Sequence, residues 1–393
     1  MDRDAIRALA AQIAPEVTTW RRHLHQNPEL SFEEQETAAF VTERLTEMGY
    51  TPRTGVGGGY GVVAVLEGGK PGPTIALRAD MDALPIHEET GLAFASTRPG
   101  VMHACGHDAH TSVLLGTARA LKQIQAQVPG KIVLLFQPAE EKPPGGAKAM
   151  VAAGVLEGVD AVFGIHVSNP VDTGKLGFRA GPVNANSDRF QVTLHGRGGH
   201  AAGPHNTVDP IVMLGATISS LQSIVSRSVN PMENGVVTIG WVRGGDADNV
   251  IPERVEFGGT VRTFDPKVQE LIHARIKAVA EGVAAAHGGR AEVVSTYGYP
   301  VLNNDARITD VARKVATEIF GVDNIVEPPA GMGGEDFAYY AQVRPACFAR
   351  LGTGTPTTMN IPAHNPRFVI SEDSFAMGVA YYVGLALHAG ALI

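Results

Sequence analysis

Short apolar runs alternate with helical stretches through the first half of the chain, and this rhythm constrains the fold more than any other feature. Four runs rich in Val, Ile and Leu lie at residues 61–67, 74–80, 131–137 and 160–166. Uninterrupted apolar runs of this length are typical of strands that are buried on both faces. Residues 108–127 form a long helical stretch between two of them. We therefore expect an α/β sandwich around a mostly parallel sheet.

The rhythm changes near residue 184, where a second, self-contained order of elements begins. The pattern predicts strands at residues 188–195, 235–242, 254–263 and 291–297, and helices at 209–227 and 266–287. This order, βαββαβ, is typical of a ferredoxin-like unit. The α/β pattern then resumes with a helix at 308–320 and a strand at 346–351. We therefore expect a discontinuous main domain, residues 1–183 and 300–393, interrupted by an inserted domain at 184–299.

A local motif predicts where an early helix begins. Ser31 is followed three residues later by Glu34, which is the spacing of a capping box. Val41 and Leu45 then recur at helical spacing, and Gly49 supplies a stop. We therefore expect the side chains of Ser31 and Glu34 to cap this helix.

The overall composition excludes some classes of partner. The chain has 393 residues, of which 44% are hydrophobic, and a formal charge of −8. Its sequence pI is about 6.0. This balance offers no basic surface for nucleic acid or acidic lipid, and no apolar run approaches the length of a membrane span. A charged N-terminus without an apolar signal core, together with only two cysteines, leads us to expect a cytoplasmic protein.

Residue types that bind metals gather at the ends of the predicted strands. Cys105 and His107 lie just before the long helix, whose N-terminal dipole favours a thiolate. A lone buried cysteine, or a hydrogen-bonded histidine at a strand end, needs no metal. Ligands in open α/β sheets, however, bind beyond the carboxyl ends of the strands, so the group together predicts metal-assisted hydrolysis. The other members of this group are Asp80, Asp82, Glu140, Glu141 and His166.

Seven short segments, in order and spacing, resemble the M20 metallopeptidase family. They are RHLHQNPELS at residues 22–31, RADMDALP at 78–85, HACGHD at 103–108, QPAEE at 137–141, GIH at 164–166, GGEDF at 333–337 and HNP at 364–366. More narrowly, they resemble its amidohydrolase branch, which includes hippurate hydrolases, N-acyl-amino-acid amidohydrolases and hydrolases of plant auxin conjugates. The resemblance implies a metal-binding catalytic main domain and an inserted domain that serves as a lid and for dimerisation.

The resemblance also implies a site with two divalent metal ions and a general base, Glu140. The five ligands that it implies are Cys105, His107, Glu141, His166 and His364. Asp82 would orient an imidazole, whereas a part for Asp80, His103 or His110 in metal binding stays open. A donor set of N, O and S atoms suits Zn, Mn, Co or Ni.

The two neighbouring glutamates can divide the work. Successive side chains point in different directions, so one carboxylate can bind metal while the other takes a proton from water. Two ions roughly 3.5–4 Å apart lower the pKa of that water to about 7 and polarise the scissile carbonyl. Glu140 would then pass the proton to the leaving amine.

The inserted domain is also expected to contribute to catalysis. In the family that the chain resembles, a histidine of this domain stabilises the oxyanion in the partner subunit's site, and an asparagine contacts the substrate. The matching residues are His200 and Asn249. Arg262 is a candidate clamp for a carboxylate, although an arginine at a strand end is often an ordinary surface charge. A donor supplied by the partner would require a homodimer or homotetramer.

We therefore expect a metal-dependent amidohydrolase that cleaves N-acyl amino acids, with an acetyl or aromatic acyl group, to a carboxylate and a free amino acid. Which acyl group and which amino acid are left open. An N-acetyl-diaminopimelate deacetylase, a dipeptidase or a carboxypeptidase on the same fold is an alternative. The peptidases are disfavoured because those relatives typically lack the Cys-Gly-His arrangement. A non-catalytic metal-binding regulatory protein is the alternative of another class, but it would not need Glu140.

Overall fold

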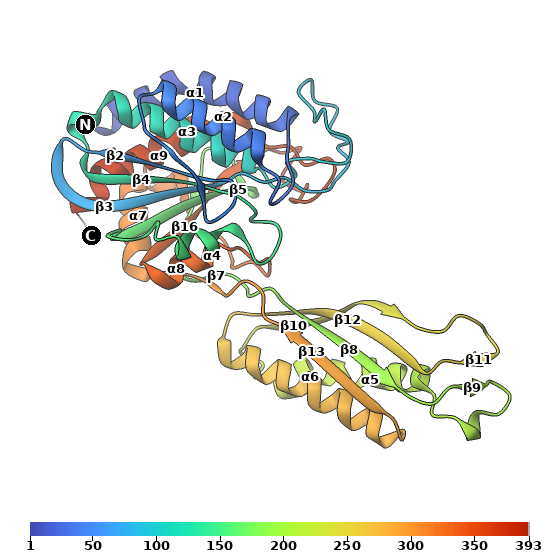
Figure 1. Ribbon diagram of the computed structural model, residues 1–393. Coiled ribbons are helices and arrows are strands. Elements are labelled where there is room, and N and C mark those ends of the chain that lie inside the picture. Colours follow the sequence, from blue (N-terminus) through green and yellow to red (C-terminus); the bar gives the residue numbers. More distant parts are fainter. Residues whose placement is uncertain (392–393) are drawn as a thin grey trace. The chain divides into compact units, whose positions relative to one another are not determined.

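The computed structural model describes residues 1–391 and forms two compact units (Figure 1). Unit 1 comprises Met1–Val183, Leu302–Ala330 and the chain from Asp336 onward, and unit 2 comprises Asn184–Val301 and Gly331–Glu335. That unit 1 is the catalytic domain and that unit 2 serves as a lid or for dimerisation stay predictions. No helix within residues 1–391 is both long and apolar enough to cross a membrane.

Unit 1 is built on an eight-stranded sheet with the order β1-β2-β4-β3-β5-β16-β6-β15. Its strands are β1 (Arg53–Val56), β2 (Gly61–Glu67), β3 (Lys70–Asp80), β4 (Pro129–Gln137), β5 (Ala161–Asp172), β6 (Leu176–Gly177), β15 (Ile325–Val326) and β16 (Ala346–Gly354). The central strands β4, β3, β5 and β16 run parallel, whereas β1, β2 and β6 form antiparallel pairs. The predicted mostly parallel sheet is therefore confirmed.

Helices cover both faces of this sheet (Figure 1). They are α1 (Arg3–Gln26), α2 (Gln35–Glu47), α3 (His107–Gln123), α4 (Gly146–Ala152), α7 (Ala306–Phe320), α8 (Ala338–Val343) and α9 (Phe375–His388). Leu77 and Leu134 belong to the core under α1, α2, α3, α7 and α9, whereas Ala76 and Leu135 belong to the core under α4 and α8. Neighbouring strand residues serve different cores because successive side chains point to opposite faces. A separate two-stranded sheet pairs β7 (Gly181–Asn184) with β14 (Leu302–Asn304).

One predicted strand end is wrong. His166 was expected to end its strand, but β5 continues to Asp172. The extension is held by β16, which pairs with Ser168 and Asp172 beyond the apolar run. His166 therefore projects from the middle of a strand that is fixed on both sides of it.

The predicted capping box is also wrong. Glu34 immediately precedes α2, but its side chain makes no cap hydrogen bond. The carboxylate of Glu29 instead accepts from the backbone N–H and the hydroxyl of Thr37, at 2.7 and 2.9 Å. The hydroxyl of Ser31 donates to Asp82 at 2.6 Å. Glu34 accepts from the backbone N–H of Ala139. Both side chains of the predicted box are therefore hydrogen-bonded to residues far along the chain instead of to the helix end.

Unit 2 has a four-stranded antiparallel sheet in the order β10-β12-β8-β13, with two helices packed on one face (Figure 1). The elements are β8 (Asp188–His195), α5 (Pro210–Ser223), β10 (Gly235–Arg243), β12 (Arg254–Thr263), α6 (Pro266–Ala286) and β13 (Arg290–Thr296), with a short ladder of β9 (Gly199–His200) and β11 (Val250–Ile251). Phe190 and Val192 of β8 face the helices, because buried and exposed residues alternate along this strand. The predicted ferredoxin-like unit is confirmed.

Candidate metal centre

A left-handed glycine brings two predicted ligands together at the start of α3. Gly106 has a φ of +89° and precedes the first residue of the helix, His107. A Cβ at Gly106 would lie 2.3 Å from the side chain of Val167. Both the backbone angle and the space therefore require glycine. The turn leaves ligand atoms of Cys105 and His107 within 4.8 Å of each other.

The other predicted ligands reach the same place from three segments. His166 lies on β5, Glu141 follows β4, and His364 lies in the loop after β16. The backbone of His364 is left-handed, with a φ of 66°. Its N–H donates to the carbonyl of Ala104 at 2.8 Å. This bond ties the loop to the segment that carries Cys105.

The five predicted ligands form two groups of three that share Cys105. One group is Cys105, His107 and His166, the other is Cys105, Glu141 and His364, and within each group the ligand atoms lie within 4.8 Å of one another. Sγ of Cys105 is 3.4 Å from Nε2 of His166. Nε2 of His364 is 3.2 Å from Oε1 of Glu141. One sulfur between two groups of donors is an arrangement that suits two neighbouring cations.

The orientation of the imidazoles fits a metal centre. Nδ1 of His107 is 3.1 Å from Oδ1 of Asp82, while its Nε2 is buried without a hydrogen-bond partner among residues 1–391. His166 is held in the same way, because its Nδ1 donates to the carbonyl of Val167 at 2.7 Å. One nitrogen of each ring is thus fixed by the protein and the other faces the cluster, as in metal-binding histidines.

The electrostatics of the cluster call for a cation. Burial and the Glu141 carboxylate raise the pKa of the Cys105 thiol. Hydrogen bonding to Cys105 and Glu141 raises the pKa of His364 to about 10. The N-terminal dipole of α3 favours a thiolate, but burial and a negative neighbour outweigh it at Cys105. A bound divalent cation would reverse this balance, since it stabilises a thiolate directly.

Asp82 contacts two of the predicted ligands. One of its oxygens faces His107, and the other accepts from the hydroxyl of Ser31 at 2.6 Å and from the backbone N–H of Glu141 at 2.9 Å. Burial favours the neutral acid, yet the hydrogen bond to His107 holds the pKa of Asp82 below its usual value. Asp82 therefore links a residue of α3 to a residue that follows β4.

Glu140 adjoins this cluster. One of its carboxylate oxygens lies within 4.8 Å of ligand atoms of His107 and Glu141. The side chain is buried, with 6% of the residue exposed. Ala139, between β4 and Glu140, is left-handed with a φ of 54°. The chain thus turns sharply just before its two adjacent carboxylates.

The structure shows different surroundings for Asp80, His110 and His103, whose part in metal binding the sequence left open. Oδ1 of Asp80 is 2.6 Å from Nδ1 of His110, and Oδ2 accepts from Arg78 at 2.7 Å. The other nitrogen of His110 accepts a backbone N–H of β5 at 2.8 Å. Asp80 and His110 come close enough to His107 to hold a metal, but these bonds already occupy them. The buried ring of His103 has no hydrogen-bond partner in the described part of the chain and belongs to neither group of ligands.

Two of the predicted residues of the inserted domain lie side by side in unit 2. His200 of β9 pairs with Val250 of β11, and the carbonyl of Asn249 accepts from the N–H of Ala201 at 3.1 Å. Nδ1 of His200 accepts from the N–H of Ala202 at 3.1 Å. A neutral His200 ring therefore carries its proton on Nε2 and can donate from that atom.

Arg262 lies at the other end of the unit 2 sheet. The ladder that carries His200 follows the end of β8 where His195 pairs with Arg254. Arg262 is eight residues further along β12, which corresponds to roughly 26 Å. Its guanidinium is half-buried and donates to the carbonyls of Asp188 and Val261, at 3.2 and 3.1 Å, and burial lowers its pKa. Unit 2 therefore does not bring Arg262 near His200.

Several buried residues near the cluster were not identified from the sequence. Asp336 accepts from Arg78 at 2.9 Å and from the backbone N–H of Ala147 at 3.0 Å. Its neighbour Phe337 lies in the core. Ser31, Arg78 and Asp336 all lie in segments that carry the resemblance, and this was the available signal.

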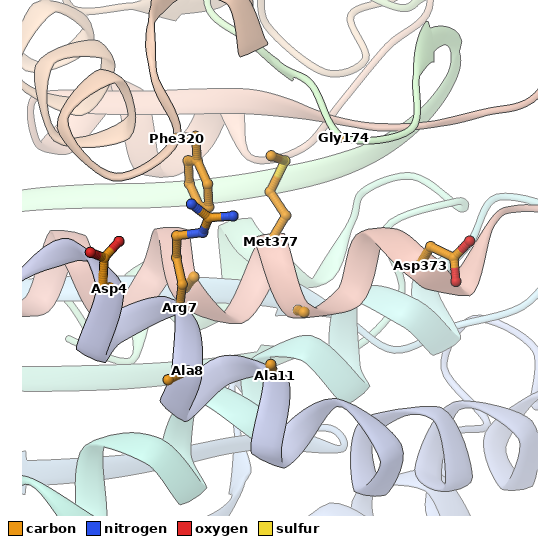
Figure 2. Close-up of a pocket in the computed structure, with 10 residues that line it drawn as sticks. Asp4, Arg7, Ala8, Ala11, Gly174, Phe320, Asp373 and Met377 are labelled. Carbon is orange, nitrogen blue, oxygen red and sulfur yellow. The ribbon is translucent and has the colours of Figure 1, made fainter.

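A hollow elsewhere on unit 1 contains none of these side chains (Figure 2). Its volume is about 480 Å³, and α1 and α9 supply most of its walls. The residues that line it are Asp4, Arg7, Ala8, Ala11, Gly174, Phe320, Asp373, Ala376, Met377 and Ala380. The candidate functional site is therefore the cluster around Cys105.

Three enzymes with similar sequences match the chain over most of its length. An N-acetyl-L-cysteine deacetylase of Bacillus subtilis is 46% identical over 90% of this chain and 83% of its own. An N-acyl-L-amino acid amidohydrolase of Geobacillus stearothermophilus is 46% identical over 78% and 82%. A thermostable carboxypeptidase of Saccharolobus solfataricus is 38% identical over 95% and 96%.

The fold and the family agree with these similarities. The crystal structure of a dinuclear metal binding peptidase of the M20 family from Bacillus subtilis matches with a TM-score of 0.85, at 36% identity, over 98% of this chain and 100% of that one. The model of peptidase family M20/M25/M40 matches residues 76–388. The chain therefore belongs to peptidase family M20/M25/M40.

Proposed function

We propose that this enzyme hydrolyses the amide bond of N-acyl amino acids and releases a carboxylic acid and a free amino acid. The observation that carries the proposal is the pair of ligand groups that share Cys105, with Glu140 beside them. The names of the deacetylase and amidohydrolase relatives support the same reaction. Because a thiol ligand must stay reduced, we also propose that the enzyme works in the cytoplasm.

The residues that would hold two divalent ions are Cys105, His107, Glu141, His166 and His364. Their mixture of sulfur, nitrogen and oxygen donors suits Zn, Mn, Co or Ni. When bound, two such ions would supply Lewis-acid chemistry, which would acidify the attacking water and polarise the scissile carbonyl. Asp82 supports this centre by orienting His107 and by fixing the backbone of Glu141.

Glu140 is the general base in this proposal. Its carboxylate takes a proton from the attacking water, whose oxygen forms the new bond to the carbonyl carbon. The same proton then passes from Glu140 to the nitrogen of the leaving amino acid as the C–N bond breaks. The burial of Glu140 excludes bulk water, which would otherwise compete for this proton.

Unit 2 would complete the site from a partner subunit. We propose that His200 donates from Nε2 to the developing oxyanion, that Asn249 contacts the substrate and that Arg262 binds a carboxylate. The tautomer of His200 supports its part, because Nδ1 already accepts a backbone N–H. The part of Arg262 has weaker support, because its guanidinium is engaged by two backbone carbonyls.

The surface of α5 supports a homodimer. The helix has no charged residue between Pro210 and Ser223, yet it exposes Ile211 and Val212, which are 46% and 54% accessible. The neighbouring strand β10 is an edge of the sheet. An uncharged helix face beside an unpaired strand edge is typical of a surface that another copy covers.

Replacing Gly215 of α5 by Arg should break this dimer. A side chain at Gly215 meets nothing within 4 Å inside the subunit, so the fold should tolerate it. Light scattering should then show monomers, and kcat should fall at least about tenfold because the partner's donor is lost. Gly282 of α6 is equally open and serves as the control, since Gly282→Arg should stay dimeric and active. A fully active monomer would refute a donor supplied by the partner.

A substrate panel tests the proposed function. Metal-loaded enzyme would be assayed with hippurate, N-acetyl amino acids, N-acetyl-diaminopimelate and dipeptides. We expect a kcat/KM for one of the N-acyl amino acids at least about tenfold above that for any dipeptide. The carboxypeptidase relative makes peptide hydrolysis the second candidate, and a preference for dipeptides would favour it. Absence of turnover with every compound would favour a non-catalytic metal-binding protein.

A further inference from the structure

A buried carboxylate next to the proposed base has no part in the site described so far. Glu34 is completely buried. Its Oε1 accepts the backbone N–H of Phe32 at 3.0 Å and that of Ala139 at 2.7 Å. The second bond joins residues 105 positions apart in the chain. Glu34 therefore ties the segment before α2 to the segment that follows β4.

Both residues that Glu34 holds have an unfavourable backbone conformation. Phe32 and Ala139 have φ angles of 70° and 54°. Within residues 1–391, the third non-glycine residue with a positive φ is the predicted ligand His364. A residue with a Cβ stays in this region only where its surroundings hold it there. Glu34 supplies a hydrogen bond to two of the three.

The conformation of Ala139 sets the direction of the chain at the proposed base. Ala139 immediately precedes Glu140, and its carbonyl accepts from the N–H of Gly146 at 3.0 Å. One residue after the base, the N–H of Glu141 donates to Asp82. Two buried carboxylates thus hold the backbone on either side of Glu140. Only one of them, Asp82, also contacts a predicted ligand side chain.

The backbone uses a single acceptor atom of Glu34. Its Oε2 is buried and makes no hydrogen bond to the described residues. Burial and the nearby charge of Asp82 raise the pKa of Glu34 to about 7. A side chain that keeps the accepting oxygen but carries no charge should therefore serve as well.

We propose that Glu34 is a positioning residue for the general base, because its Oε1 holds Ala139 in the left-handed turn that directs the carboxylate of Glu140. This inference rests on the proposed function, since a turn before Glu140 affects the rate only if Glu140 is the base. Glu34 touches neither substrate nor metal in this arrangement.

The test compares three variants of Glu34 in the dimeric, metal-loaded enzyme. Glu34→Ala removes the acceptor and should lower kcat about a hundredfold with KM changed by no more than about threefold, because small misplacements of reacting groups cost this much. Glu34→Gln keeps the acceptor and should stay within about threefold of the parent kcat. Glu34→Asp keeps the charge but withdraws the oxygen by one methylene, so its kcat should fall as in Glu34→Ala. Glu33, the exposed neighbour, supplies the control Glu33→Ala, which should change nothing.

Two further readouts do not depend on turnover. Metal content should stay at two ions per subunit in all four variants. Hydrogen exchange in the peptide that covers residues 138–146 should quicken in Glu34→Ala and Glu34→Asp but not in Glu34→Gln. If Glu34→Ala fails to fold, the comparison of Gln with Asp still decides, and an Asp variant as active as the Gln variant would overturn the inference.

The outcome also separates this inference from the proposed function. If Glu140→Gln were active, Glu140 would not be the general base, and the proposed function on which this inference rests would fail. If Glu140→Gln is inactive while Glu34→Ala keeps its full kcat, only the positioning part of Glu34 fails.

Discussion

Replacing Glu140 by Gln should lower kcat at least about a hundredfold while two metal ions stay bound to each subunit. Gln has nearly the shape of Glu but cannot accept a proton at neutral pH, and general base catalysis contributes about 10²- to 10⁴-fold. The fold should not change, because Glu140 is buried at the end of a turn that other side chains fix. Steady-state kinetics and elemental analysis of the metal content would measure both parts of this result.

The adjacent residue gives a matched control for this prediction. Glu141→Gln makes the same chemical change one position along the chain, where we propose a metal ligand. It should lower the metal content as well as kcat, and added metal should restore part of its activity. If Glu140→Gln turned over within about tenfold of the parent enzyme, Glu140 would not be the base. If it lost metal like Glu141→Gln, the division of work between the two glutamates would be wrong.

The parts of the fold that follow from local patterns were predictable. β8 and β12 have the predicted bounds, and the predicted helix at 266–287 differs from α6 by one residue at its end. In these elements the apolar period matches the face that is buried in unit 2, so the pattern and the tertiary structure agree. The end of β5 was missed because Ser168, Asn169 and Pro170 are residue types typical of turns, and the pairing of this segment with β16 depends on a strand far along the chain.

Two helices that pack on the sheet of unit 1, α1 and α9, were not predicted, each for a different reason. α9 is apolar on nearly all sides because it is buried in unit 1, so it lacks the polar stripe that marks a surface helix. α1 does have apolar residues at helical spacing, but it contains Pro15, which usually ends or kinks a helix. Residue composition and the spacing of apolar residues alone therefore fail to identify some of the helices that pack on the sheet.

The candidate ligands could be singled out from the sequence because they lie in segments that resemble a known family. The structure adds that two groups of these residues share Cys105. Local sequence patterns do not contain this, because it depends on distances between segments that are far apart in the chain. The failure of the capping box at Ser31 and Glu34 has the same cause. Their local spacing fits a helix cap, but each side chain gains a buried partner more than fifty positions away. Local rules tend to fail where a functional site competes for the same side chain.

Replacing Cys105 by Ala should remove metal from both positions at once and abolish turnover. Cys105 is the only residue that belongs to both ligand groups. Each group would keep two donors from separate segments, without the sulfur that joins them. Because bound metal stabilises only the folded protein, the melting temperature of the parent enzyme should fall on chelation, whereas that of Cys105→Ala should respond little to chelator or metal. Metal analysis and thermal unfolding with and without chelator would measure this.

Cys347 provides the control, and an aspartate variant tests what the sulfur does. Cys347 lies in the core of unit 1, so Cys347→Ala should lower the melting temperature through a small cavity but keep two ions and activity. Cys105→Asp offers a carboxylate, whose two oxygens can also bind two neighbouring cations, and should recover part of the metal binding that Ala loses. If Cys105→Ala kept two ions per subunit, the two groups would be independent sites. The proximity of the sulfur to both groups would then be a coincidence of packing, and the proposal that Cys105 is a ligand common to both ions would fail.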